Sequence, residues 1–428
     1  MNVTKNKATK TARKLISYFC IIAMIFTMMV GMSVSAFAAD IDPEFFFNEI
    51  QQIGASEYHN LYLMNDGTVW TCGGLSDLIT VPKKVQGLTD VICVAAAPTI
   101  SFAVKSDGTL WTWGEGNQTS LSQAAISDVT CIYVSQQNSY YVLKSDGTVW
   151  CWGTNNAGQL GDGTKTNKSI PVQVKESSTT PLTDVQAVSV GHKFALFLKS
   201  DGTVWSCGGS TYGELGRTGD PLYAMQISGL TDVIEISAGS EHCLALTSNG
   251  MMWAWGLNSK GQLGEGTQTN RTSPVMVTNG ISNVKAIAAA GSTTEAMASI
   301  TSQTSHVLKT DGTVWSWGYN FLGNNNNFTD MSIMPVQVNK LRNIKSITAT
   351  NGVLHAGIFA IGEDGSAWGW GHMGGFQIGA GIAGYLRMPI KINEPDNSSG
   401  SNTFKAEVLL EIDQDEVRLL DWNLMREQ

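Results

Sequence analysis

The sequence predicts an all-β protein, a seven-bladed β-propeller with four-stranded antiparallel blades. Charged residues are 15% of the 428 residues and glycines number 45. This balance is typical of short strands and tight turns. An Asp-Gly or Asn-Gly pair followed by tryptophan recurs seven times. The copies are roughly fifty residues apart, a period at which each repeat is one unit of a propeller or solenoid.

The recurring tryptophan stands four residues after the Asp or Asn in every copy. Most copies have a second tryptophan two positions later, in the pattern "WxWG". Residues i and i+2 of a strand face the same way, so both side chains can pack between neighbouring blades. A residue found at one position in all copies serves a task common to all, and we interpret the first tryptophans as scaffold: Trp70, Trp111, Trp150, Trp205, Trp253, Trp315 and Trp368.

The copy at residues 185–228 shows the order of elements. "VQAVSVG" and "FALFLKS" predict two strands joined by the short loop "HK". Asp201-Gly202 is expected to form a two-residue hairpin turn in which both residues tolerate positive φ. "TVWSCG" predicts a third strand, and a glycine-containing loop leads to a weak fourth strand, "AMQI", which reads "PVQV" or "PVMV" in sister copies. Small residues fill the first strands, so we place these strands innermost.

The predicted propeller spans residues 50–392, after an N-terminal segment at 39–49. Copy two lacks a clear fourth strand, and copy six has an insertion from Ser292 to Ser305. Residues 393–403 have the composition of a linker. Residues 404–428 form a tail that is too short for its own core and resembles the start of a truncated second domain.

The N-terminus has the pattern of a secretory signal peptide at residues 1–38. A basic segment precedes an apolar run from Leu15 to Val30, and Ala36 and Ala38 occupy small-residue cleavage positions. We therefore expect cleavage after Ala38 and a secreted or cell-surface protein; an uncleaved anchor is the alternative. Cleavage removes five basic and no acidic residues, so the net charge falls from −9 to −14. Such a charge disfavours nucleic acid and anionic membranes as partners.

Six cysteines follow the predicted cleavage site, and we expect them to be small buried hydrophobic residues. Cys72 and Cys207 stand where sister copies have the second tryptophan. The even count leaves disulfides open. His59 and His242 are interpreted as structural, because sister copies carry unrelated residues at the same position. No group of residues has metal-ligand spacing and no nucleophile motif appears, so we predict no catalytic residue, metal or cofactor.

The repeat pattern resembles the regulator of chromosome condensation family. The likeness is carried by "SAGSEHCLALTSNGMMWAWGLNSKGQLGEGTQTNRTSPVMV", from Ser237 to Val277, and extends over about residues 50–392. The resemblance implies a seven-bladed propeller, and the signal peptide points to the secreted bacterial members. Family members include a nucleotide-exchange factor for a small GTPase and a propeller that inhibits β-lactamase. No residue pattern allows an exchange site to be carried over, because fold does not determine function.

The loops between first and second strands, and between third and fourth strands, share one face. The first–second loops differ from copy to copy, and variation over a constant scaffold is typical of a recognition surface. We predict a non-enzymatic, monomeric binding module that recognises an extracellular protein or a cell-wall glycan. Its predicted contact residues on the first–second loops are Glu57, Tyr58, Gln137, His192, Lys193, Glu241 and His355. On the outer loops, Tyr212, Tyr319 and Phe321 are predicted to add aromatic anchors.

Three other functions remain open at this point. The same face could inhibit a secreted enzyme such as a β-lactamase. A polysaccharide hydrolase or lyase would need two carboxylates roughly 5–10 Å apart near the channel, with one in an apolar setting. Nucleotide exchange on a small GTPase is the third alternative, and the predicted secretion opposes it.

Overall fold

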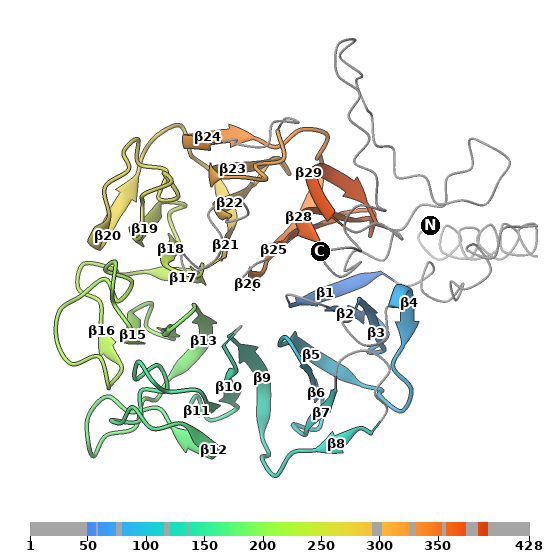
Figure 1. Cartoon of the computed structure of the whole chain (residues 1–428), viewed down its shortest axis with the longest axis vertical. Coiled ribbons are helices and arrows are strands. Elements are labelled where there is room, and N and C mark those ends of the chain that lie inside the picture. Colours follow the sequence, from blue (N-terminus) through green and yellow to red (C-terminus); the bar gives the residue numbers. More distant parts are fainter. Residues whose placement is uncertain are drawn as a thin grey trace, which may run out of the picture. The chain divides into compact units, whose positions relative to one another are not determined.

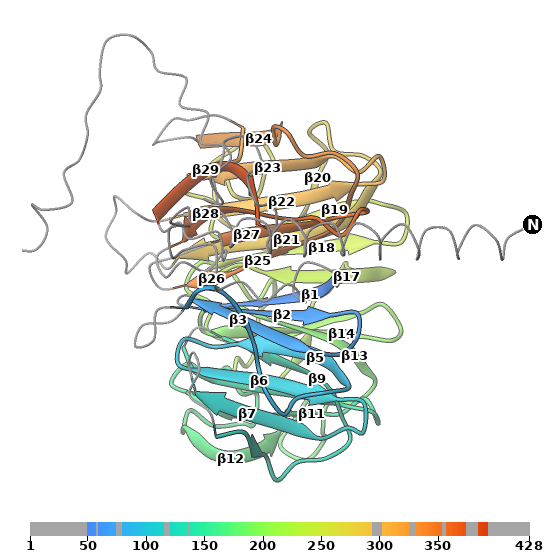
Figure 2. The same cartoon turned by 90° about the vertical axis from the view of Figure 1, so that its right-hand side faces the viewer.

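Seven antiparallel sheets surround a central channel, as predicted (Figure 1). The computed structural model describes residues 49–392, apart from 57–58, 74–78, 115–119, 136, 293–301, 325–330, 353–356 and 374–383. The predicted signal peptide, linker and tail lie outside these residues. The described part contains no helix, and the strands run from one face of the ring to the other (Figure 2).

Each blade is one continuous stretch of chain whose strands run in order from the channel outwards. The innermost strands are β1 (Ile50–Ala55), β5 (Val91–Ala96), β9 (Val129–Val134), β13 (Val185–Val190), β17 (Val233–Ala238), β21 (Val284–Ser292) and β25 (Ile344–Ala349). The second strands are β2 (His59–Met64), β6 (Ile100–Lys105), β10 (Ser139–Lys144), β14 (Phe194–Lys199), β18 (His242–Thr247), β22 (Gln303–Lys309) and β27 (Gly357–Gly362).

The third strands carry the tryptophans: β3 (Val69–Gly73), β7 (Leu110–Gly114), β11 (Val149–Gly153), β15 (Val204–Gly208), β19 (Met252–Gly256), β23 (Val314–Tyr319) and β28 (Ala367–Met373). The outermost are β4 (Ile79–Lys84), β8 (Ser122–Gln123), β12 (Lys168–Gln173), β16 (Met225–Gln226), β20 (Arg271–Val277), β24 (Met331–Gln337) and β29 (Gly384–Lys391). The weak fourth strands expected in copies two and four are thus two residues long. A short strand, β26 (Asn351–Gly352), adds to β21 in parallel.

The Asp-Gly hairpins differ in register from the prediction. The Lys199 carbonyl accepts a hydrogen bond from Gly202 N–H, so Ser200 and Asp201 are the central residues of the turn. Gly202 alone has a positive φ, +77°, which identifies a three-residue loop with a glycine bulge. The prediction of a two-residue turn at Asp201-Gly202 is therefore wrong. Asp201 instead accepts hydrogen bonds from the backbone and hydroxyl of Thr203, whose hydroxyl accepts from Trp205 Nε1.

The two tryptophan positions are not equivalent. The first is partly buried in most copies, near the hairpin, whereas the second is fully buried in blades five to seven, as Trp255, Trp317 and Trp370. Trp255 Nε1–H donates to the carbonyl oxygen of Glu214, 2.8 Å away in the preceding blade. Trp317 donates in the same way to Gln262, at 2.9 Å. In these two seams the "GELG" or "GQLG" loop of one blade thus holds the second tryptophan of the next blade, so both have a structural role there.

The ring closes by packing blade one against blade seven. Ile50, Tyr62 and Trp70 of blade one form one buried cluster with Phe359 and Ile361 of blade seven. The four strands of blade one and those of blade seven each come from one continuous stretch of chain, so closure does not require a strand exchanged between the two ends.

Proline protects the outer edge of the ring. Pro171, Pro274 and Pro335 lie at one register position of β12, β20 and β24, beside a shift in pairing with the third strand. Proline has no N–H to offer a further strand and is confined to edges and bulges. The "PVxV" motif therefore discourages edge-to-edge association.

Two cysteines depart from the expectation of buried thiols. Cys93 of β5 and Cys131 of β9 form a disulfide, with their Cα atoms 5.5 Å apart, and it joins the innermost strands of blades two and three. Cys72, Cys151, Cys207 and Cys243 are free and buried, as predicted. The sequence could not select the pair, because the two cysteines are 38 residues apart and meet only once the blades stand side by side.

Candidate binding pocket

The loops that follow β13 and β17 lie together at the seam between blades four and five. His192 N–H donates to the carbonyl oxygen of Ser240, 3.0 Å away. Ser240 Oγ donates onward to the carbonyl of Gly291 in blade six, at 2.5 Å. The predicted loop face is therefore linked from blade to blade by its own hydrogen bonds.

A cavity of about 140 Å³ opens at this seam. Four of the predicted contact residues line it: His192, Lys193, Tyr212 and Glu241. The remaining lining includes Phe194, Ser240 and an acid that the sequence analysis did not select, Glu214. His192, Glu214 and Glu241 are only 5–6% exposed, so these polar side chains belong to an enclosed pocket.

Glu214 is a buried acid with a strongly shifted pKa. Burial, with a smaller contribution from the nearby carboxylate of Glu241, raises the pKa of its carboxyl to about 7. The Tyr212 backbone N–H, 2.7 Å from Oε2, favours the ionised form and limits this rise in pKa. Glu214 therefore changes charge near neutral pH.

Glutamine occupies the place of Glu214 in two sister loops. Gln159 Oε1 accepts a hydrogen bond from the Ala157 backbone N–H, and Gln262 Oε1 accepts one from Lys260, both at 2.9 Å. Glu214 Oε2 makes the equivalent contact with Tyr212. The loop conformation thus needs an acceptor oxygen at this position but does not need a charge.

The other predicted residues lie elsewhere. Gln137 is in the β9–β10 loop, where its N–H donates to Ser135 Oγ. Tyr319 lies under the ammonium of Lys260, 4.5 Å from its ring centre, and Phe321 is only 8% exposed. Burial leaves Phe321 little surface for the predicted role of aromatic anchor. Three of the predicted contact residues lie outside the described residues: Glu57, Tyr58 and His355.

His59 and His242 have the structural role that was predicted. Both are completely buried, and their Nε2 atoms lie 2.8 Å from Ser101 Oγ and 2.9 Å from Ser305 Oγ, respectively, in the next blade. Burial lowers the pKa of each imidazole to about 4. These histidines are neutral at physiological pH and tie neighbouring blades together.

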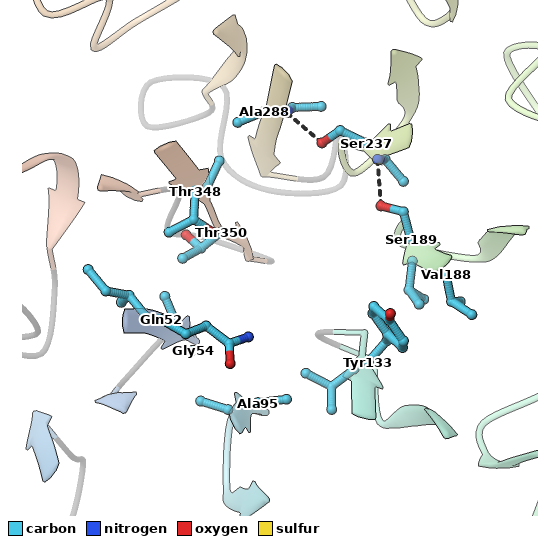
Figure 3. A pocket seen from close by; sticks show the side chains of 18 of the residues that line it. Gln52, Gly54, Ala95, Tyr133, Val188, Ser189, Ser237, Ala288, Thr348 and Thr350 are labelled. Atoms are coloured by element: carbon cyan, nitrogen blue, oxygen red, sulfur yellow. Dashed lines mark hydrogen bonds between the residues drawn. The ribbon is translucent and has the colours of Figure 1, made fainter. Parts of the chain in front are cut away.

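The central channel has a volume of about 310 Å³ and is lined by the innermost strands of all seven blades (Figure 3). Hydrogen bonds cross its seams: Ser189 Oγ accepts from Ala238 N–H and Ser237 Oγ from Ala289 N–H, both at 2.9 Å. Among the described lining residues Glu235 alone carries a charge, and it accepts from Ile287 N–H at 3.2 Å. Burial raises the pKa of Glu235 to about 7.

Replacing Glu235 with glutamine should raise the free energy of unfolding by about 2 kcal/mol at pH 8. The pKa of Glu235 is about 7 in the folded protein, against 4.5 ordinarily. Between these values the unfolded chain ionises while the folded carboxyl stays protonated, so stability falls as the pH rises from 4.5 to 7, whereas an amide has no such loss. Gln52 shows that the amide fits, since its Oε1 accepts from Val94 N–H at 3.0 Å in the corresponding seam. The gain should vanish as the pH falls through 7 towards 4.5. Urea unfolding at pH 8 and at pH 4.5 tests this prediction, and an equal gain at both pH values would contradict the raised pKa of Glu235.

The sequence did contain a signal for Glu214. The "GELG" loop of blade four differs from the "GQLG" of blades three and five by one residue. The pattern predicts a structural turn, which is correct for the backbone, but this interpretation gave no reason to consider the side chain of Glu214.

No described group of three or more His, Cys, Asp or Glu residues could hold a metal ion. The described segments also include no helix long and apolar enough to cross a membrane.

The sequence profile of the "Regulator of chromosome condensation (RCC1) repeat" matches residues 146–198, 201–246 and 249–297. A second profile of this repeat matches 185–214 and 233–262. The first matched segment begins in the β10–β11 hairpin and ends within β14. The repeat of the family is therefore offset from the blade by two strands, and each repeat contains one seam.

Similar solved structures share this fold. Human WBSCR16 aligns with a TM-score of 0.61 and 19% identity, over 74% of this chain and 85% of that one. Prp20p of Saccharomyces cerevisiae, studied for its binding to Gsp1p and histones, aligns with a TM-score of 0.60 and 19% identity over 78% and 88%. The human and mouse E3 ubiquitin-protein ligase HERC2 are 28% identical over 177 residues, 38% of this chain but only 3% of their own length.

Proposed function

We propose that this chain, of which residues 146–297 match the profile of the regulator of chromosome condensation repeat, is a secreted, non-enzymatic module that binds a protein partner through its loop face. The observation that carries the proposal is the pocket between blades four and five. Four of the predicted contact residues meet there in one enclosed cavity: three were selected because their loops vary, and Tyr212 was selected as an aromatic residue of an outer loop. Enclosed pockets that receive a partner's side chain are where binding energy concentrates at protein interfaces.

Two features support a location outside the cytosol. The first 38 residues have the pattern of a signal peptide. The disulfide between Cys93 and Cys131 is of a kind that persists in oxidising compartments and is rare where thiols are kept reduced. Pulse-labelling with cell fractionation tests this part of the proposal: a processed chain outside the membrane supports secretion, and an unprocessed cytosolic chain contradicts it.

Replacing both His192 and Tyr212 with alanine should weaken binding to the partner by about tenfold or more. The partner would first be isolated by crosslinking to the full chain in culture medium and cell wall, then purified for titration calorimetry. Lys345→Ala is the matched control, because Lys345 is exposed at the start of β25, at the hairpin end of the strand. Equal affinities for the double variant and the control would contradict the proposed face. Retention by purified cell-wall polysaccharide alone would show a glycan ligand instead.

A further inference from the structure

We infer that the disulfide between Cys93 and Cys131 is a redox-sensitive lock on the seam between blades two and three. When a thiol reductant opens the bond, this seam separates while the seams of the later blades stay closed. The inference adds a conformational device to the proposed binding role and does not depend on which partner the loop face binds. It follows from the different ways in which the seams are held together.

Three later seams are closed near the loop face by a leucine and a backbone carbonyl of the preceding blade. The leucines of seams three–four, four–five and five–six are Leu160, Leu215 and Leu263, each at most 2% exposed. The carbonyl of the residue before each leucine accepts a hydrogen bond from the third strand of the next blade. Trp255 and Trp317 are two of these donors, and Cys207 Sγ donates to the carbonyl of Gln159 at 3.2 Å.

No loop leucine belongs to the described apolar cluster between blades two and three. Blade two has seven residues between β7 and β8, at 115–121, whereas blade three has fourteen between β11 and β12, at 154–167. The shorter segment has no Gly-x-Leu-Gly pattern. Its single leucine, Leu121, packs on the other side of blade two, in the cluster shared with blade one.

The seam between blades two and three is also less completely buried than later seams. Eight hydrophobic residues of its cluster are only partly buried, against two in seam four–five and two in seam five–six. Trp152 is one of them, and it packs against Phe102 and Tyr140 with ring centres 5.2–6.5 Å apart. Phe102 itself is 1% exposed, so its accessibility reports whether this seam is open.

The remaining contacts give the disulfide the role of a lock. On the face of the Asp-Gly hairpins, the Gly108 carbonyl accepts from Val129 N–H at 3.0 Å, a contact that recurs at other seams. Along the innermost strands, Gln52 and Glu235 accept hydrogen bonds from backbone N–H groups of the next blade. Cys93 is the equivalent third residue of its strand, and it is bonded covalently to the next blade instead.

The bond can be opened from the side of Cys131. Cys131 is partly exposed, whereas Cys93 is 3% exposed, so a thiolate of a dithiol reductant attacks Cys131 Sγ. The S–S bond breaks, Cys93 leaves as a thiolate that takes up a proton, and the reductant is joined to Cys131. The second thiol of the reductant then displaces the Cys131 thiolate, which is protonated in turn, and the reductant departs as a cyclic disulfide. The protein thereby gains two electrons and two protons.

Hydroxyl-radical footprinting of the full chain tests the inference. The oxidised protein is compared with protein that has been reduced and then freed of the reductant under nitrogen. The oxidation rates of Phe102, Tyr140 and Trp152 should rise about threefold or more, because the opened seam admits water. The rates of Trp255 and Trp317, in seams closed by a loop leucine, should not change. Reoxidation with oxidised glutathione should restore the original rates.

Two variants serve as controls. The double variant Cys93→Ser, Cys131→Ser should show the raised rates without reductant and should not respond to it. Cys243→Ser should respond like the wild type, because it removes a buried free thiol in another seam, and a serine hydroxyl can keep the hydrogen bond of Cys243 Sγ to the Glu214 carbonyl.

Two results would overturn the inference. One is an unchanged rate for Phe102, Tyr140 and Trp152 while thiol titration shows that the bond is open. The other is an equal rise at Trp255 and Trp317, which would show that reduction loosens the whole ring. If the double variant does not fold, the comparison of oxidised and reduced wild type decides between these outcomes.

Discussion

Trp317→Ala should lower the free energy of unfolding by about 4 kcal/mol. Trp317 is completely inaccessible to solvent and packs in the core between blades five and six with Leu263 and Ile287. Its Nε1–H also donates to the carbonyl of Gln262 at 2.9 Å. The substitution therefore leaves a large cavity and removes the donor of a buried carbonyl at the same time.

The matched control is Trp152→Ala, at the same position of β11. Trp152 is partly exposed and lies against the rings of Phe102 and Tyr140, at 6.5 and 5.6 Å between centres. Its loss should be about half that of Trp317, because water can reach the space left behind. Urea unfolding at pH 7 followed by circular dichroism gives both values. Equal losses would show that burial in the seam does not set the contribution of the second tryptophan.

Removal of the Cys93–Cys131 disulfide should lower the free energy of unfolding by about 3 kcal/mol. The bond closes a long loop, since the cysteines are 38 residues apart, and it joins two blades at the innermost strands. Opening the loop gives the unfolded chain more conformations, so the folded state loses relative stability. The double variant Cys93→Ser, Cys131→Ser and urea unfolding measure the effect.

Dithiothreitol provides the control for this substitution. The reductant should bring the wild type close to the double variant and should leave the double variant unchanged. The four free cysteines are buried and do not form the bond, so their reduction state is constant throughout. A wild type whose midpoint is insensitive to reductant, with free thiol titration confirming that the bond is open, would contradict a stabilising disulfide.

Much of the fold was predictable because the same pattern of strand and turn residues occurs in seven copies. The alternation in each copy marks the strands, and the small residues of β13 and its equivalents identify the channel side. The predicted turn type was wrong, because it depends on local backbone geometry. The turn at Asp201-Gly202 is displaced by one residue, since only the glycine has the left-handed conformation. The disulfide could not be predicted for another reason: its two cysteines come from different blades and meet only across a seam.

The site was predictable in part for the opposite reason, because it lies where the copies disagree. Loop variation led to His192, Lys193 and Glu241, and the search for aromatic anchors on the outer loops led to Tyr212; the structure brings these four together. Glu214 was missed because it stands inside a conserved-looking loop pattern of the repeat, where one residue departs from its sister copies. Phe321 was misjudged, because a loop residue is not necessarily exposed when the loop packs on the next blade.

The hydrogen bonds between the loop of one blade and the third strand of the next impose an order on folding during synthesis. The carbonyls of Gln159, Glu214 and Gln262 find their donors in Cys207, Trp255 and Trp317, which are 48, 41 and 55 residues further along the chain. On the ribosome, the newest blade is therefore always incomplete until the next hairpin emerges. A growing chain therefore has one loop carbonyl without its donor, in the most recently synthesised blade, however many blades have already formed. Only the junction of blade seven with blade one must wait for the last repeat.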